Sequence, residues 1–243
     1  MKELKLPEGL KKNVAGFVES LKGIYREELV SVILYGSAAS GELTDIHSNI
    51  NLLVVLKNTD LSSLEVARRT VNKPSHRRIE PLFLTREYVS SSTDVFPIEF
   101  LDMKENHVCL YGEDVLKEAK IDLKNLRFQC EQELKSKLLL VKQQYLVVNP
   151  KDKRALANLL FRSFTSLAHI LRNLLRLKGK TPSYAKEDLF REIAVELKME
   201  TATFAKIWQA KKDPARLNAA DLRALLGDFV RELEKIVKTV DRL

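Results

Sequence analysis

The spacing of apolar residues in the first half of the chain predicts a helix followed by a small sheet. Over residues 8–28 the apolar positions recur at three- and four-residue steps, which predicts a helix with one apolar face. Compact apolar and β-branched runs ended by small or polar residues predict buried strands. We expect such strands at residues 31–35, 51–56, 78–84 and 96–103, with short helices at residues 61–72 and 86–90.

From residue 123 onward the pattern is helical almost without interruption. The expected helices span residues 126–147, about 153–177, 184–197, 201–211 and 219–242. Antiparallel helices joined by short connections form a bundle. We therefore expect an α+β protein with two domains: residues 1–120 form a mixed sheet with flanking helices, and residues 121–243 form an all-α helical bundle.

The composition is that of a globular protein. Hydrophobic residues make up 45% and charged residues 30% of the 243 positions. The first residues lack the pattern of a secretion signal, and no apolar run approaches the roughly 20 residues of a membrane span. These features predict a cytoplasmic protein without a membrane partner. Two cysteines, Cys109 and Cys130, and four scattered histidines form no zinc-type cluster.

The net charge of +8 is unevenly distributed. Residues 1–120 carry 16 Lys and Arg against 18 Asp and Glu, whereas residues 121–243 carry 25 against 15. A basic bundle can be a nucleic-acid surface. It can equally be a set of long helices coated with lysine and arginine, and no basic run is interleaved with aromatic residues. The sequence therefore leaves open whether the protein binds nucleic acid.

The turn after the first strand carries the candidate chemistry. Gly36 permits a left-handed backbone and close approach of a ligand, and Ser37 adds a hydroxyl beside backbone N–H groups, so the pair can cradle phosphate oxygens. Asn49 and Asn51 precede and begin the second strand at positions i and i+2, which places both side chains on one face.

This order of residues resembles the nucleotidyltransferase superfamily with the DNA polymerase β type of domain, in which kanamycin nucleotidyltransferase-like proteins add a helical bundle. The first half of the signature stands here as Leu34-Tyr35-Gly36-Ser37 and the second as Ser48-Asn49-Ile50-Asn51. Where the family places two metal-binding aspartates, this chain has Asn49 and Asn51. The resemblance further implies a third metal carboxylate on a later strand. Ile98-Glu99-Phe100-Leu101 matches that pattern, so Glu99 is the remaining catalytic candidate.

The resemblance implies a nucleoside triphosphate and Mg²⁺ as cofactors and a homodimer as the assembly. Gly36 and Ser37 would hold the triphosphate, and Asn49, Asn51 and Glu99 would form a weakened or lost metal site. Hard Mg²⁺ prefers anionic oxygen, and each Asp-to-Asn exchange removes one negative charge. We therefore expect a nucleotide-binding protein whose metal-dependent nucleotidyl transfer is lost or impaired, a pseudoenzyme.

Two alternatives remain open. The first is an active transferase that passes a nucleotide to a small-molecule or protein hydroxyl, with Glu99 and loop acids such as Glu42 or Asp45 completing the metal site. The second is an RNA- or protein-binding module that uses the basic helical bundle.

Overall fold

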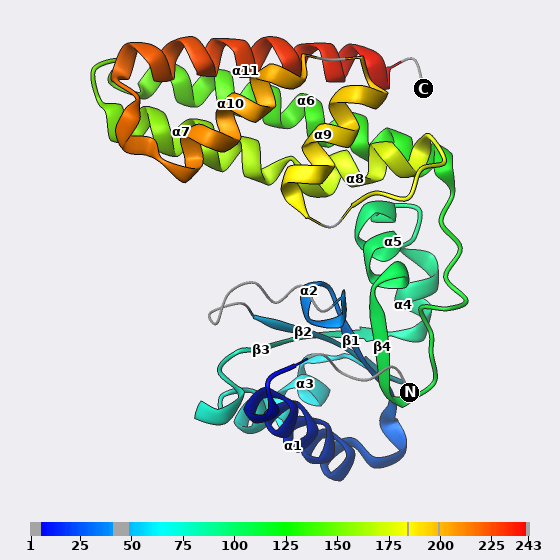
Figure 1. Cartoon of the computed structure of the whole chain (residues 1–243). Coiled ribbons are helices and arrows are strands. Elements are labelled where there is room, and N and C mark those ends of the chain that lie inside the picture. Colours follow the sequence, from blue (N-terminus) through cyan, green and yellow to red (C-terminus); the bar gives the residue numbers. More distant parts are fainter. Residues whose placement is uncertain (1–5, 41–48, 184, 199, 242–243) are drawn as a thin grey trace. The chain divides into compact units, whose positions relative to one another are not determined.

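The computed structural model describes residues 6–40, 49–183, 185–198 and 200–241. The chain divides into two compact units, Met1–Asp122 (unit 1) and Leu123–Leu243 (unit 2), which are described separately below (Figure 1).

Among the described residues of unit 1, the sheet consists of β1 (Leu29–Tyr35), β2 (Ile50–Leu56), β3 (Ile79–Thr85) and β4 (His107–Gly112), in the order β3-β2-β1-β4. β1 runs antiparallel to both β2 and β4, whereas β2 and β3 are parallel. The sheet is therefore mixed, as the sequence predicts. This topology brings the end of β1 and the beginnings of the other three strands to the same end of the sheet.

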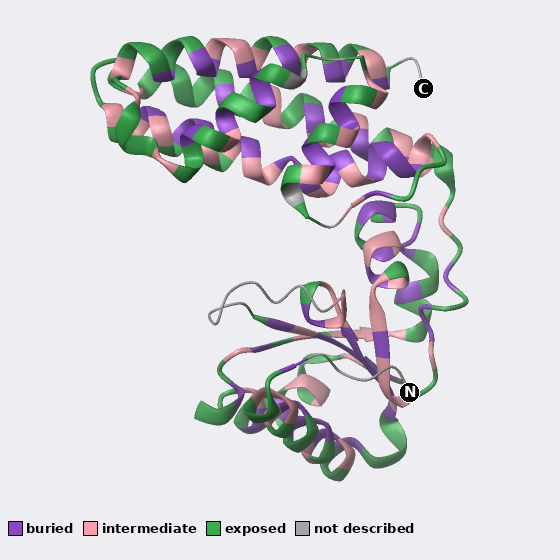
Figure 2. Cartoon of the chain, viewed as in Figure 1, coloured by how far each residue is buried: buried purple, intermediate pink, exposed green. Residues whose placement is uncertain are grey.

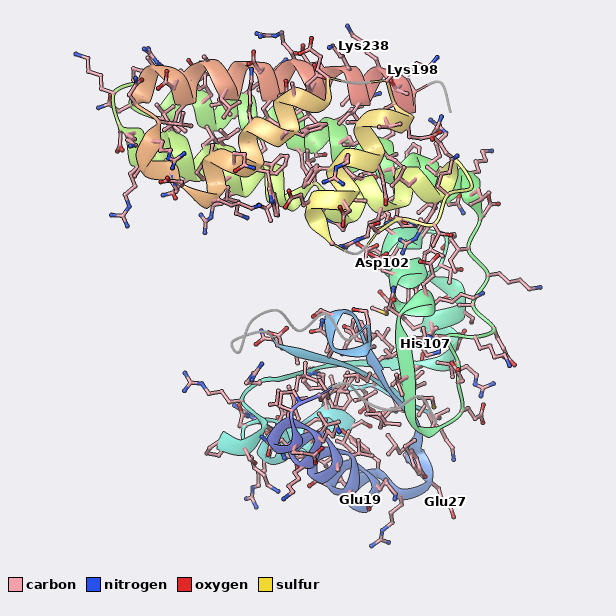
Figure 3. The ribbon with its side chains drawn as sticks, in the orientation of Figure 1. Glu19, Glu27, Asp102, His107, Lys198 and Lys238 are labelled. Carbon is pink, nitrogen blue, oxygen red and sulfur yellow. The ribbon has the colours of Figure 1, made fainter. Side chains whose placement is uncertain are left out.

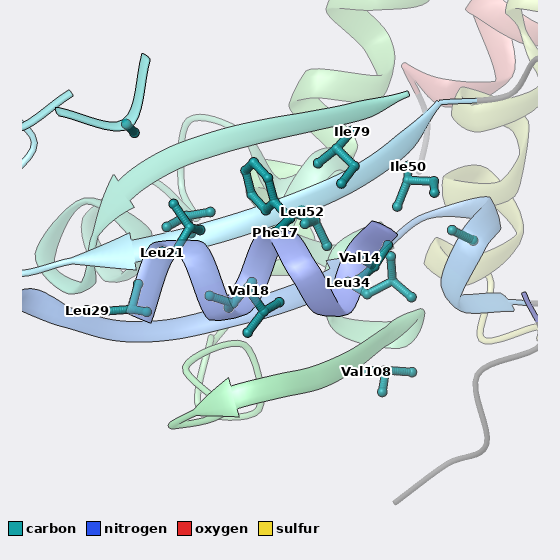
Figure 4. Packing of buried hydrophobic residues seen from close by; sticks show 14 of the residues in the cluster. Val14, Phe17, Val18, Leu21, Leu29, Leu34, Ile50, Leu52, Ile79 and Val108 are labelled. Carbon is teal, nitrogen blue, oxygen red and sulfur yellow. The ribbon is translucent and has the colours of Figure 1, made fainter. Parts of the chain in front are cut away.

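Helices cover both faces of this sheet. The remaining elements of unit 1 are α1 (Glu8–Tyr25), α2 (Ser37–Ser40), α3 (Leu61–Val71), α4 (Arg86–Ser91), α5 (Pro97–Glu105) and the short 3₁₀ helices at Arg26–Glu28 and Pro74–His76. Figure 4 shows α1 lying along one face, with Phe17 and Leu21 packed against residues such as Leu52 and Leu34. On the opposite face Ile33 packs with Phe100 and Met103 of α5 and with Leu53, Val55 and Val89. The two central strands, β1 and β2, are consequently buried on both sides, whereas α1 exposes its outer side (Figure 2).

The prediction of a strand at residues 96–103 is wrong, because this segment forms helix α5. Its first turn is closed by the Phe100 N–H, which donates to the Phe96 carbonyl oxygen at 3.1 Å. Pro97 occupies the first turn, where a missing N–H leaves no helical hydrogen bond unmade. The fourth strand is instead β4, which pairs with the open side of β1.

Unit 2 is helical throughout its described residues. Its elements are α6 (Leu123–Val147), α7 (Lys153–Ser166), α8 (Ala168–Leu177), α9 (Lys186–Glu196), α10 (Thr201–Lys212), a 3₁₀ turn at Pro214–Arg216 and α11 (Ala219–Val240). The long second helix expected from the sequence is interrupted at Leu167, which separates α7 from α8. The α+β fold class, with a mixed sheet followed by a helical part, is confirmed. None of the helices in the described ranges is both long and apolar enough to cross a membrane.

Candidate functional site

The Gly36–Ser37 turn lies where β1 ends. Gly36 has a φ of +73°, a left-handed conformation that glycine adopts without the strain other residues incur. Its carbonyl oxygen accepts hydrogen bonds from the N–H groups of Ala39 at 2.9 Å and Ser40 at 3.1 Å, which fixes the one-turn helix α2 directly behind it. Ser37 is exposed. The turn therefore presents the Ser37 hydroxyl and a backbone without a side chain at the end of the sheet.

Asn51 lies beside this turn. It is the partner of Tyr35 in the β1–β2 register, and a Cβ atom added to Gly36 would lie 3.3 Å from its Nδ2. Strand alternation places Asn51 on the same face as Leu53, which packs toward α5. Asn49 is exposed just before β2 begins. The structure thus brings Gly36, Ser37 and Asn51 together, with Asn49 close by.

Glu80 is the carboxylate that the strand register places beside the two asparagines. Glu80 is the partner of Asn51 in the parallel β2–β3 pair, and the Asn49 side-chain amide donates a hydrogen bond to Glu80 Oε1. Glu99 lies exposed on α5, outside the sheet. The sequence pattern Ile79-Glu80-Pro81-Leu82, an acid flanked by apolar residues in a strand, was the signal that could have identified Glu80.

Tyr35 is affected by the charge of this carboxylate. Its phenol is half-buried, and its pKa is raised from the ordinary value, mainly by burial and additionally by the negative charge of Glu80. The same negative field would favour a bound cation, so Glu80 is the anionic centre of the site.

His107 begins β4 opposite Tyr35 and is labelled in Figure 3. Its Nδ1 lies 2.8 Å from the Lys104 carbonyl oxygen, and its Nε2 lies 2.9 Å from Asp114 Oδ1. Both ring nitrogens therefore contact groups within unit 1, which fixes the position of the His107 ring at the start of β4.

The side chains described at this end of the sheet do not fit a two-magnesium site. They offer the carboxylate of Glu80 and the neutral amides of Asn49 and Asn51, whereas Mg²⁺ prefers several anionic oxygens. Within the described ranges, no group of three or more His, Cys, Asp or Glu side chains could hold a metal ion. Glu42 and Asp45, the loop acids considered as substitutes, lie outside the described residues.

The chain shares its fold with a solved nucleotidyltransferase, as the sequence resemblance implies. Spectinomycin adenyltransferase AAD(9) from Enterococcus faecialis, solved with ATP and spectinomycin, aligns over 92% of this chain and 99% of its own with a TM-score of 0.57 and 13% identity. A nucleotidyltransferase-like protein from Exiguobacterium sibiricum 255-15 aligns over 91% of this chain and 74% of its own at 14% identity, with a TM-score of only 0.36. The identity to AAD(9) is so low that the likeness shows a shared fold and nothing finer. No protein-family model and no curated protein matches the chain.

Proposed function

We propose that this protein binds a nucleoside triphosphate at the Gly36–Ser37 end of the sheet and has lost, or nearly lost, metal-dependent nucleotidyl transfer. The observation that supports this proposal is the pairing of Asn49 with Glu80. In the superfamily signature the position of Asn49 is a metal-binding aspartate, and here its amide N–H occupies a carboxylate oxygen that a metal ion would need.

The negative charge at the site determines whether the protein can catalyse metal-dependent nucleotidyl transfer. Two unit charges about 4 Å apart attract by about 4 kcal/mol at an effective dielectric constant of about 20, and each dication doubles that figure. Replacing two carboxylates with amides removes two such attractions. Nucleotidyl transfer places two divalent cations a few ångström apart, and negative charge on the protein must offset the repulsion between them. The single carboxylate of Glu80 does not replace the charge that the two asparagines lack.

Nucleotide binding has lower requirements. Backbone N–H groups and the Ser37 hydroxyl can contact phosphate oxygens without a protein-bound metal, and a triphosphate carries its own counter-ion. The presence of ATP in the AAD(9) structure supports this choice of ligand. In this proposal Mg²⁺ arrives with the nucleotide and is not held by the protein.

The test is calorimetric titration of the full chain with ATP and with GTP, each with and without Mg²⁺. We expect saturable binding of at least one nucleotide that changes little when Mg²⁺ is removed. The Ser37→Ala variant should bind more weakly, and Ser75→Ala, an exposed serine of the Pro74–His76 turn, should bind as the native chain does. Absence of binding to either nucleotide would refute the proposal.

The charge of the C-terminal half of the chain favours RNA binding as a second candidate function. Lysine and arginine outnumber aspartate and glutamate by 25 to 15 over residues 121–243. Several of these cations are already paired on the surface, for example Lys142 with Glu234 at 2.7 Å. RNA binding through phosphate contacts weakens steeply with salt. Retention of single-stranded RNA at low salt, lost as salt rises, would support this function, and no retention at low salt would exclude it.

A further inference from the structure

The last turns of α6 carry an exposed apolar patch. Its four apolar residues, Leu139, Leu140, Leu146 and Val147, expose between 50% and 84% of their surface. Leu146 and Val147 each follow one of the other two leucines by about two helical turns, so all four side chains lie on one side of the helix. Gln143 is exposed between the two pairs. These five residues are called the α6 patch below.

The opposite side of α6 forms part of the core of unit 2. Cys130, Leu134 and Val141 are buried on that side, and α6 packs against α7, α8 and α11. The helix therefore uses one side for the bundle and presents the α6 patch on the other. An exposed apolar surface of this kind is typical of a site of protein association.

The α6 patch consists of neutral residues. Lys142, which lies beside it in the sequence, is paired with Glu234 of α11, with 2.7 Å between Nζ and Oε1. Gln143 and the neighbouring Gln144 are uncharged. The cores of protein interfaces are poor in charged residues. The α6 patch has this composition, so its burial leaves none of its own residues as an unpaired charge.

The order of residues in the α6 patch is symmetric about Gln143. Leu139 and Val147 lie at equal distances along the chain on either side of it, and so do Leu140 and Leu146. A two-fold axis at Gln143 that relates two antiparallel α6 helices therefore places Leu140 opposite Leu146 of the second copy. A two-fold dimer requires such a self-complementary surface. The Gln143 amide both donates and accepts hydrogen bonds, so two copies of it can pair at the axis.

The size of the α6 patch fits a weak dimer. A fully exposed leucine or valine offers on the order of 100 Å² of apolar surface, so the four apolar side chains present roughly 280 Å² in each copy. Because interfaces are roughly 60% apolar, two copies joined here would bury roughly 1,000 Å² in total. This area is at the lower limit for a specific interface.

We propose that two copies of this chain associate through the α6 patch, as a two-fold pair of antiparallel α6 helices with Gln143 at the axis. The exposed apolar residues supply the contact, and the symmetry about Gln143 selects a second copy of the chain as the partner. The area sets an affinity in the micromolar range. This inference is independent of the nucleotide site, since every residue it uses belongs to unit 2.

Sedimentation equilibrium of the full chain, from micromolar to hundreds of micromolar concentrations, tests the association. We expect a reversible equilibrium between monomer and dimer. Leu146→Glu introduces a charge into each half of the contact and should weaken dimerisation at least tenfold. Val195→Glu, the matched change at a residue of α9 that is 67% exposed, should leave dimerisation unchanged. Circular dichroism of both variants should match that of the native chain, because both residues are exposed.

Two results would overturn the proposal at this stage. The first is a chain that remains monomeric at every concentration, as expected if a different protein covers the α6 patch. The second is a dimer that Leu146→Glu leaves intact, which would place the contact on another surface.

A mixture of two variants tests the second copy and the antiparallel register together. Leu140→Lys alone should weaken dimerisation as Leu146→Glu does. In the proposed register these two positions face each other across the axis, so a dimer of one variant with the other gains a Lys–Glu pair and keeps one native Leu–Leu contact. We expect the mixture to dimerise at least tenfold more tightly than either variant alone. A mixture that associates no better than its components would overturn the proposal, because parallel helices or a different contact surface would give that result.

Discussion

Replacing Gly112 with alanine should destabilise unit 1 more than an ordinary glycine substitution does. Gly112 ends β4, pairs with Ser31 of β1 and has a φ of +74°. An added Cβ would lie 2.0 Å from the Val30 carbonyl oxygen and 3.0 Å from the Val30 carbonyl carbon. These are backbone atoms of the central strand, so the contact cannot be relieved by a side-chain rotation.

The expected cost follows from two contributions. A left-handed conformation costs an alanine roughly 1–2 kcal/mol. Forcing extra volume into a packed site costs roughly 1–3 kcal/mol. The Gly112→Ala variant should therefore lose about 2–5 kcal/mol of unfolding free energy, a large part of the roughly 5–15 kcal/mol that stabilises a typical domain.

The assay combines urea denaturation, which gives the free energy of unfolding, with amide hydrogen exchange, which gives the protection of the β1 and β4 residues. Trp208 lies in unit 2, so its fluorescence follows that unit and separates a loss confined to unit 1 from a general one. The matched control is Gly16→Ala in α1, where an added Cβ meets no atom within 4 Å. This change should be neutral or stabilise by about 0.5–1 kcal/mol. Similar effects of the two substitutions on β1 protection would refute the reasoning.

Three further predictions concern single polar or backbone groups. Gly36→Ala, which strains a φ of +73° and brings a Cβ to 3.3 Å from Asn51 Nδ2, should weaken nucleotide binding about tenfold by calorimetry. Asp60 caps α3 through hydrogen bonds from the Ser63 N–H and Ser62 hydroxyl, which lower its pKa from 3.8 to about 2. Its stabilising effect is therefore present above pH 4 and lost as the pH falls toward 2, and Asp60→Asn should flatten that part of the pH–stability curve. Asn218→Ala removes the capping box of α11 and should cost unit 2 about 1 kcal/mol, seen as a lower urea midpoint of Trp208 fluorescence.

Elements with a clear period were predictable from the sequence, whereas the segment around Glu99 was not. In the sequence, Glu99 is flanked by the apolar residues Ile98 and Phe100, which is a strand-like pattern. Helix α5 forms because Pro97 is tolerated in a first helical turn and because β4 already occupies the free side of β1. That second reason is a property of the whole sheet and cannot be read from the segment itself.

The site was only partly predictable for a similar reason. The Gly36–Ser37 turn and the spacing of Asn49 and Asn51 are local features, and they lie at one end of the sheet. Which acid joins them depends on strand order and register, because Glu80 faces Asn51 only when β3 runs parallel beside β2. Pro81 is tolerated in that strand because β3 lies at the edge of the sheet.

We propose that Asn49 and Asn51 prevent metal-dependent chemistry at the nucleotide site, with Glu80 as the remaining carboxylate. The most direct test is ATP binding with and without Mn²⁺, measured by calorimetry for the native chain and for the Asn49→Asp/Asn51→Asp double variant. Glu80→Gln and Glu99→Gln are each added to the double variant as matched exchanges.

We predict that Mn²⁺ leaves ATP binding by the native chain nearly unchanged and strengthens binding by the double variant. Glu80→Gln should remove this gain, and Glu99→Gln should preserve it. Strong Mn²⁺ dependence in the native chain, or a gain in the double variant that depends on Glu99 and not on Glu80, would contradict the account.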